Sequence, residues 1–357
     1  MKTDRKLILE DGSEYYGTGF GSGKDVVCEV VFNTSVVGYQ EILSDPSYTD
    51  QAVVMSYPTI GNYGITEEDF ESRRIAPSAF IVRDVCRNPS NFRSTLSVEE
   101  LLEENDIPGI SGVDTRRLVR SIREYGTRRG LVTDSDTPVQ EGLERIRAAD
   151  IPHDAVRRSS CRKKWYSRTA NPRFNVVIID CGMKANIVRA LNRNRCNVTI
   201  VPYDTGHEEI LALSPDGILV SNGPGDPQDV PEVVYTLQNI IGKCPIFGIC
   251  LGHQLLALAY GAKTYKLPFG HRGGNHPVKE LRTGRIYVTS QNHSYAVDEK
   301  SLSNTGLKVS HFNLIDHTVE GLFSEKDAVF SVQFHPESAP GPQDAIDLFE
   351  AFTAIMP

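Results

Sequence analysis

The residue in this chain best suited to nucleophilic chemistry is Cys250, which follows the apolar run PIFGI and precedes the helical pattern LGHQLLALA. Gly248 and Gly252, two positions before and after it, permit a sharp turn and close packing of a helix on a strand. This spacing is typical of the strand–turn–helix elbow that presents a nucleophile, with Cys where many hydrolases have Ser. The positive end of the helix dipole favours a thiolate there. The alternative is a buried cysteine in an ordinary α/β turn.

A cysteine nucleophile needs a base, and the base needs a group that orients it. The segment VFSVQFHPE places His335 at the end of a predicted strand and Glu337 two residues later. His335 would take the thiol proton and later protonate the leaving amine, while Glu337 would fix the imidazole tautomer. A lone His-Pro-Glu segment is more typical of a surface turn, but together with the Cys250 elbow it predicts a catalytic triad.

The oxyanion of such a reaction needs two N–H donors. Leu251, which directly follows the nucleophile, supplies one from its backbone. We expect the other from Gly225 in the loop SNGPGDP, which follows a predicted strand at 217–221 and so ends at the same sheet edge. An ordinary Gly/Pro turn is the alternative for this loop.

Bulk composition excludes several classes of protein. The 357 residues carry a net charge of −8, which argues against a general nucleic-acid binder. No apolar run approaches the ~20 residues of a membrane span. The seven cysteines are dispersed and contain no CxxC pair, so we expect reduced thiols, a cytoplasmic location and no metal site. The segment GTGFGSGKD at 17–25 departs from a phosphate-binding loop at Thr18 and Asp25, so any ATP chemistry belongs to another chain.

The pattern of elements predicts an α/β protein of two domains. Residues 1–134 read as a β-rich domain, 135–172 as a linker, and 173–357 as a domain with a mostly parallel sheet flanked by helices. In the first domain, Asp114 caps a helix that ends near Gly126. One face of that helix is basic, with Arg116, Arg117, Arg120 and Arg123.

The motifs GICLGHQ (248–254), NGPGDP (222–227) and HPE (335–337) resemble those of class I (triad) glutamine amidotransferases. Further stretches are similar to the carbamoyl-phosphate synthase small chains: FGHRGGNHPV (269–278), SQNH (290–293), FNT (32–34), GYQEILSDPSY (38–48), YPTIGNYG (57–64) and GVDTR (112–116). The last four lie in the first domain, which therefore resembles the N-terminal domain of that family. The resemblance covers essentially the whole chain.

This resemblance implies hydrolysis of L-glutamine to glutamate and ammonia through a thioester on Cys250. Ammonia would pass to a large chain that makes carbamoyl phosphate from bicarbonate and two ATP, for arginine and pyrimidine synthesis. ATP and Mg are thus expected on the partner, with no cofactor in this chain. The implied assembly is a heterodimer or a higher assembly, without nucleic acid or membrane. The basic helix face and the basic linker are the expected contacts with the large chain.

Contacts with glutamine are also implied by the resemblance. The positions that match are Ser47, Gly223, Gly225, Leu251, Gln254, Asn292, Ser294 and Tyr295. Two of them depart from the family pattern, because Ser294 and Tyr295 stand where Gly-Phe is usual after Asn-His. Contacts there are expected through the backbone.

Two other functions compete with this interpretation. A free-standing Cys–His–Glu hydrolase would use the same triad, but it has no need of residues 1–134. A non-catalytic regulatory partner of the synthetase would need no triad at all.

Overall fold

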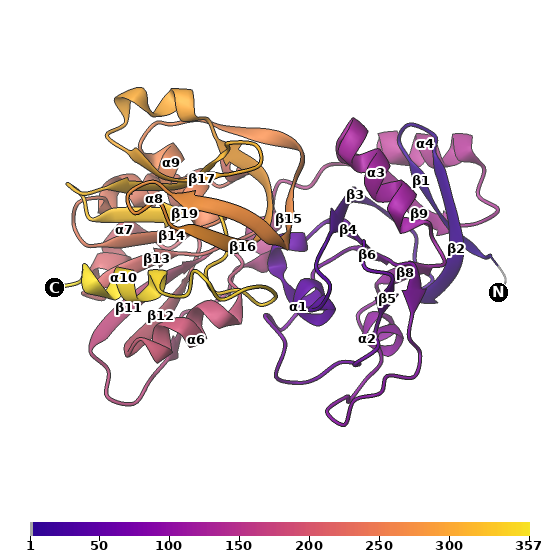
Figure 1. The fold of residues 1–357 in the computed structure, drawn as a ribbon, viewed down its shortest axis with the longest axis horizontal. Coiled ribbons are helices and arrows are strands. Elements are labelled where there is room, and N and C mark those ends of the chain that lie inside the picture. Colours follow the sequence, from indigo (N-terminus) through magenta and orange to yellow (C-terminus); the bar gives the residue numbers. More distant parts are fainter. Residues whose placement is uncertain (1–2) are drawn as a thin grey trace. The chain divides into compact units, whose positions relative to one another are not determined.

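The computed structural model describes residues 3–357, which divide into two compact units, one ending at Pro152 and the other beginning at His153 (Figure 1). The division falls inside the segment 135–172 that the sequence predicts as a linker. Residues up to 152 belong to the first unit and the remainder to the second. The predicted α/β class with a β-rich first domain is confirmed, since strands and helices form both units.

The first unit is built on a closed barrel. Its strands, in spatial order, are β1 (Arg5–Leu9), β2 (Glu14–Gly21), β8 (Pro108–Ser111), β6 (Ala79–Ile81), β4 (Gln51–Met55), β3 (Val26–Asn33) and β9 (Arg128–Asp134). A small separate sheet pairs β5 (Thr59–Ile60) with β7 (Asp84–Val85). Closure leaves no unpaired strand edge in the barrel, so these strands offer no edge for pairing with another chain.

Helices of the first unit cover the barrel and carry its loops. They are α1 (Tyr39–Ser44), the 3-10 turn η1 (Pro46–Tyr48), α2 (Val98–Glu104), α3 (Thr115–Tyr125) and α4 (Val139–Ala148). The predicted cap of α3 is confirmed, because Asp114 Oδ1 accepts from the Arg117 N–H at 3.0 Å and the helix ends at Gly126. Helix α4, inside the predicted linker, packs Ile146 against Ile8 and Leu131 of the barrel.

The second unit is built on one mixed sheet. In spatial order its strands are β10 (Trp165–Ser167), β12 (Cys196–Pro202), β11 (Phe174–Asp180), β13 (Gly217–Val220), β14 (Ile246–Ile249), β19 (Val329–Val332), β18 (Val319–Ser324), β17 (Lys308–Asn313), β15 (Thr264–Glu280) and β16 (Ile286–Val297). The strands from β12 to β19 are parallel, whereas β10 and the strands from β18 to β16 pair antiparallel. The predicted parallel sheet is therefore the middle of a larger mixed one.

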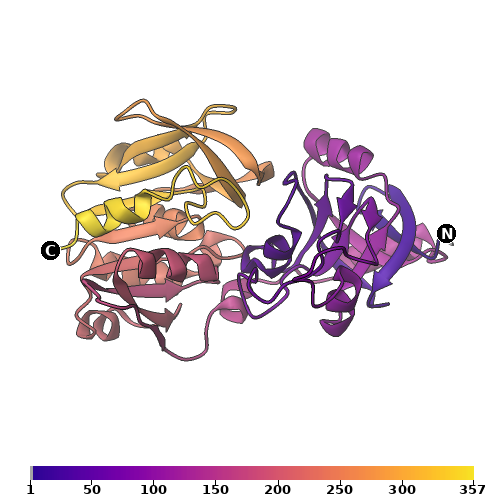
Figure 2. The same ribbon diagram turned by 60° about the horizontal axis from the view of Figure 1, so that its bottom comes forward.

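Helices cover both faces of the parallel strands (Figures 1 and 2). One face packs α6 (Ala185–Arg193) and α10 (Leu348–Ala354) around Phe247, and the other packs α7 (His207–Ala212), α8 (Pro231–Ile240) and α9 (Leu251–Ala259). Three further elements of this unit are α5 (Ala155–Ser159) and the 3-10 turns η2 (Pro227–Asp229) and η3 (Glu299–Asn304). Burial on both faces explains why β11 reads as a nearly continuous apolar run.

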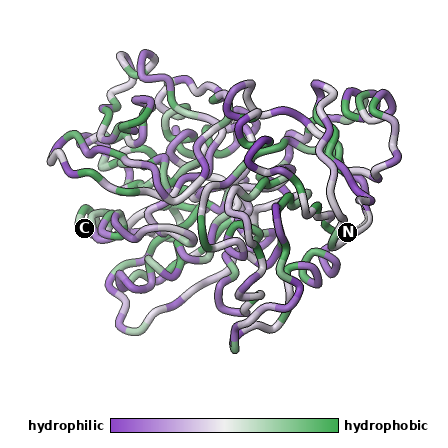
Figure 3. Tube along the Cα trace, turned by 45° about the vertical axis from the view of Figure 1, so that its right-hand side comes forward, coloured by the Kyte–Doolittle hydropathy of each residue, from purple (hydrophilic) through white to green (hydrophobic). Residues whose placement is uncertain are grey.

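Hydrophobic and hydrophilic stretches alternate over short distances along the chain (Figure 3). Within residues 3–357, no helix combines the length and the apolar character that a membrane span needs.

Candidate active site

Cys250 occupies the turn between β14 and α9 with φ +53° and ψ −103°. A non-glycine residue at positive φ costs free energy and is held there by its surroundings. Hydrogen bonds fix both sides of the turn: the Cys250 N–H donates to Val332 O at 2.9 Å, and its carbonyl accepts from the His253 N–H at 3.1 Å. The predicted strand–turn–helix elbow is thus present.

The two glycines that flank the elbow allow the helix to approach the sheet. A Cβ on Gly252 would lie 2.1 Å from Val220 O, and one on Gly248 would lie 2.8 Å from Gly252 O. Neither position has room for a side chain, so α9 begins directly against β13 and β14. This packing places the N-terminus of α9 at the sheet edge where Cys250 lies, and the Gly252 N–H donates to Ser221 O at 3.1 Å.

His335 and Glu337 form the predicted pair. His335 Nδ1 lies 2.6 Å from Glu337 Oε1, and both side chains are almost fully buried. The other imidazole nitrogen, Nε2, has no hydrogen-bond partner among residues 3–357. The His335 N–H donates to Ser290 O at 2.9 Å, which fixes the loop after β19 to β16.

Electrostatics favour a charged pair at this place. Burial lowers the pKa of His335, but the Glu337 carboxylate and the Cys250 sulfur outweigh burial and raise it from 6.5 to about 10. Burial likewise raises the pKa of Glu337, but Lys184 and His335 outweigh it and lower the pKa to about 2. At neutral pH the arrangement therefore holds an imidazolium against a carboxylate, next to the sulfur.

Two side chains near the triad, Lys184 and Gln333, were not predicted from the sequence. Lys184, with 2% of its side chain exposed, places Nζ 2.9 Å from Glu337 Oε1 and also contacts Ser338 O. Gln333 donates from Nε2 to Cys250 Sγ at 3.7 Å. Lys184 directly precedes α6, and no sequence motif surrounds it that would indicate a role in the site. Gln333 directly follows β19 and lies two residues before His335, and this spacing is the one signal that could have identified it.

The residues expected to bind glutamine partly converge on Cys250. The Cys250 thiol lies 3.6 Å from Asn292 O in β16. Gln254 donates from Nε2 to Tyr295 O at 2.9 Å and to Gln333 Oε1 at 3.0 Å. Ser294 accepts a hydrogen bond from Arg272, and it is not among the described residues with positive φ. The replacement of the usual glycine by serine is therefore compatible with this backbone.

The two loop glycines differ in what they contact. A Cβ on Gly223 would lie 2.8 Å from Leu251 Cδ2 and 2.3 Å from Cys181 O, so the backbone of Gly223 lies against the turn after Cys250. Gly225 is exposed, has φ +88°, and lies against Ala155 instead. This packing favours Gly223, rather than the expected Gly225, as the second donor to an oxyanion.

Ser47 lies in the first unit, in η1, where its N–H donates to Asp45 Oδ1 at 2.9 Å. Its approach to glutamine stays a prediction.

Two family models match this chain. Residues 7–132 match the carbamoyl-phosphate synthase small chain, CPSase domain, and residues 177–355 match glutamine amidotransferase class-I. The match at 177–355 contains Cys250, His335 and Glu337, and it begins within β11.

Relatives align with the chain over nearly its whole length. The carbamoyl phosphate synthase small chain of Bacillus caldolyticus is 53% identical over 352 residues, which cover 99% of this chain and 96% of that protein. The carbamoyl phosphate synthase pyrimidine-specific small chain of Halalkalibacterium halodurans is 52% identical and covers 99% and 97%. A solved glutamine amidotransferase from Thermotoga maritima is 17% identical, with a TM-score of 0.37 over 46% of this chain and 76% of that one, and carries no weight here. The chain belongs to the carbamoyl phosphate synthase small chain family.

Proposed function

We propose that this chain is the glutaminase subunit of a carbamoyl-phosphate synthase. It hydrolyses L-glutamine to glutamate and ammonia, and it delivers the ammonia to a large chain. That chain makes carbamoyl phosphate from bicarbonate and two ATP, for arginine and pyrimidine biosynthesis. ATP and Mg²⁺ are expected on the large chain. We expect the complex in the cytoplasm, where a thiol nucleophile stays reduced.

The observation that carries the proposal is the strained Cys250 elbow beside the buried His335–Glu337 pair. The Cys250 thiolate attacks the side-chain amide carbon of glutamine. The negative charge that develops on the amide oxygen is stabilised by the Leu251 N–H and, we propose, the Gly223 N–H. The His335 imidazolium then protonates the amide nitrogen, so that ammonia leaves and a thioester remains.

The second half of the reaction uses the same groups in reverse. His335, now neutral, takes a proton from water as the water attacks the thioester carbon. Collapse of that intermediate releases glutamate and restores the thiolate beside the imidazolium. Glu337, with Lys184 behind it, holds the imidazole in one tautomer throughout.

Release of glutamate from glutamine tests the proposal. The comparison is between the wild type and Cys250→Ser, each with and without a large chain, bicarbonate and ATP. We expect hydrolysis by the wild type, stimulation by the large chain, and loss of hydrolysis in Cys250→Ser. Synthesis of carbamoyl phosphate from added ammonia should survive in Cys250→Ser, because the nucleophile acts only on glutamine.

Cys244→Ser is the matched control, because Cys244 is a half-buried thiol of the same unit whose pKa is raised by burial to about 11. It should leave both activities intact. Glutamine untouched by the wild type under every condition would overturn the proposal. Loss of both activities in Cys250→Ser would contradict a role confined to the nucleophile.

A further inference from the structure

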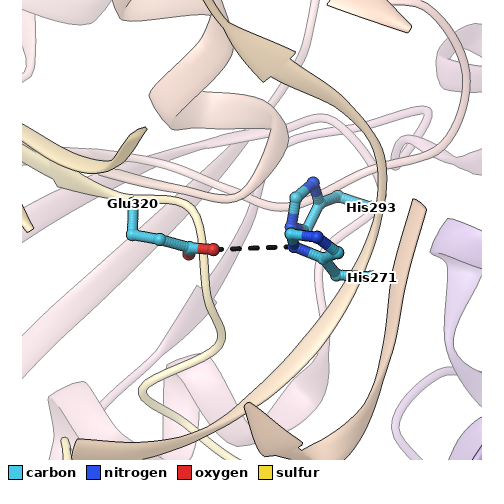
Figure 4. Close-up of side chains that lie close together, drawn as sticks. All are labelled: His271, His293 and Glu320. Carbon is cyan, nitrogen blue, oxygen red and sulfur yellow. Dashed lines mark ion pairs between the residues drawn. The ribbon is translucent and has the colours of Figure 1, made fainter. Parts of the chain in front are cut away.

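Three buried side chains that the proposed hydrolysis does not use point toward one another beside the β15–β16 hairpin (Figure 4). They are His271 of β15, His293 of β16 and Glu320 of β18, and one possible ligand atom from each lies within 4.8 Å of the others. Glu320 is fully buried, and the two histidines are less than one-tenth exposed. Since the three come from separate strands, they form no motif that the sequence could reveal.

The hydrogen bonds of the two histidines leave one nitrogen of each facing the cluster. His271 Nε2 lies 2.8 Å from Asp316 Oδ2, so its Nδ1 faces inward. His293 Nδ1 lies 2.7 Å from Tyr295 O. Because a carbonyl oxygen only accepts, the proton of a neutral His293 is on Nδ1, and the lone pair of Nε2 faces inward. An imidazole whose outer N–H is held by a carboxylate or a backbone carbonyl is the usual form of a metal-ligating histidine.

The inward-facing atoms are mostly acceptors. Gln291 Oε1 lies 3.0 Å from His271 Nδ1 and 2.9 Å from His293 Nε2, and Glu320 Oε1 lies 3.6 Å from His271 Nδ1. Glu320 Oε2 has no hydrogen-bond partner among the described residues. Asn313 Nδ2 donates to Glu320 Oε1 at 3.0 Å, so of the two carboxylate oxygens it is Oε2 that lacks a partner within residues 3–357, and a buried carboxylate oxygen without one is costly. The separations of 2.9, 3.0 and 3.6 Å lie on either side of the roughly 3.4 Å edge of a tetrahedron whose metal–ligand bonds measure about 2.1 Å, and the ligand atoms of His271, His293 and Glu320 all lie within 4.8 Å of one another.

We propose that this cluster binds one divalent cation of the zinc class. The ligands are His271 Nδ1, His293 Nε2 and the Glu320 carboxylate, with Gln291 Oε1 as the fourth. Two imidazoles and a carboxylate suit zinc and its neighbours better than magnesium or calcium. The ion ties β18 to the β15–β16 hairpin, one residue from Asn292, whose carbonyl faces Cys250. Its role is structural, and it does not depend on the function proposed above.

Cobalt(II) is the probe, because its visible absorption reports ligand number and type. The full chain is treated with a chelator, dialysed, and titrated with Co²⁺ alone. We expect one Co²⁺ per chain, with the intense visible bands of a four-coordinate site and displacement by Zn²⁺. No thiolate-to-cobalt band should appear in the near ultraviolet, since the site contains no sulfur. Such a band would place the metal on a cysteine and overturn the proposal.

Asp316→Asn tests the site with little risk to folding, because 38% of the Asp316 side chain is exposed. We expect a 10- to 100-fold loss of Co²⁺ affinity, typical of a removed outer carboxylate. Glu320→Gln should lose at least as much. His317→Asn, an exposed histidine next to Asp316, should bind as the wild type does. Failure of the wild type to bind Co²⁺ would show that the cluster is a hydrogen-bond network alone. Wild-type affinity in both Asp316→Asn and Glu320→Gln would place the metal elsewhere and would also overturn the proposal.

Discussion

Lys184 is a buried cation whose main partner is the carboxylate of Glu337. Without Lys184, a fully buried carboxylate would keep only His335 as a counter-charge. We expect Lys184→Met to lower the free energy of unfolding by about 3–5 kcal/mol, the usual cost of breaking a buried ion pair from one side. Urea denaturation of the full chain measures this.

The double variant Lys184→Met/Glu337→Gln supplies the control for that measurement. It removes both charges, so it should be more stable than Lys184→Met alone. A single variant as stable as the wild type would contradict the importance of the pair.

Stability should also depend on pH through His335. Its pKa is raised from 6.5 to about 10, so protonation of His335 stabilises the folded state. This stabilisation is complete below pH 6.5 and is lost as the pH rises through 10. We expect the free energy of unfolding to fall between these limits, and His335→Asn to flatten that part of the profile. Equal slopes in the two proteins would contradict the raised pKa.

Sequence reasoning identified the residues of the site that belong to local motifs and missed those that do not. Cys250 was identified by its flanking glycines, and His335 and Glu337 by a short spacing at a strand end. Lys184 reaches the site from a segment about 150 residues before Glu337, an encounter created only by the parallel sheet. The choice between Gly225 and Gly223 as the second oxyanion donor also depends on tertiary packing, because nothing in the loop sequence distinguishes the two.

The start of α9 depends on the absence of a side chain at Gly252. A Cβ there would meet the backbone oxygen of Val220 at 2.1 Å, and a backbone oxygen of a central strand cannot move aside. We expect Gly252→Ala to cost about 1–3 kcal/mol of stability or more, and to lower glutaminase activity by displacing the elbow. Denaturation and glutamate release measure the two effects.

Gly206→Ala is the control for this helix start. Gly206 is the residue before α7, and a Cβ there would meet nothing within 4 Å, so neither property should change by much. Normal stability and activity in Gly252→Ala would show that α9 can shift without harm.

Helices and strands with a regular apolar pattern were predicted well, whereas strands interrupted by proline, glycine or register shifts were not. The strand β11 follows from an apolar run, and the cap of α3 follows from the capping residue Asp114. The long strand β15 was not assigned, since it contains Pro268, Pro277 and several glycines that normally mark turns. Register shifts along its pairing with β16 show how the sheet accommodates them.

At the scale of the whole molecule, domain order was predictable but barrel closure was not. Alternation of strands and helices after residue 173 indicated a parallel sheet, because each strand is a separate apolar run. Closure of the barrel depends on pairing between β1 and β9, which are over 100 residues apart. No local pattern encodes such a pairing. The position of the division at residue 152 likewise depends on α4, whose amphipathic face is visible only against its barrel partners.

Coupling to a large chain is the property that belongs to the molecule as a whole. Helix α3 buries Leu118 and Ile122 and exposes Arg116, Arg120 and Arg123, which share one side because they are spaced three and four residues apart. Within residues 3–357 these three arginines form no ion pair, and such a basic face on a chain of net charge −8 suits an acidic partner surface. We expect Arg116→Glu/Arg120→Glu/Arg123→Glu to abolish co-purification of the large chain and its stimulation of glutamate release. The basal glutaminase activity of the isolated chain should not change, since α3 and Cys250 belong to different units.

The same charge reversal at three exposed positions of the second unit controls for net charge and should leave the complex intact. These positions are Arg282, Lys300 and Lys308. If both triple variants bind equally well, the interface lies elsewhere, and the basic segment between residues 155 and 173 becomes the next surface to reverse.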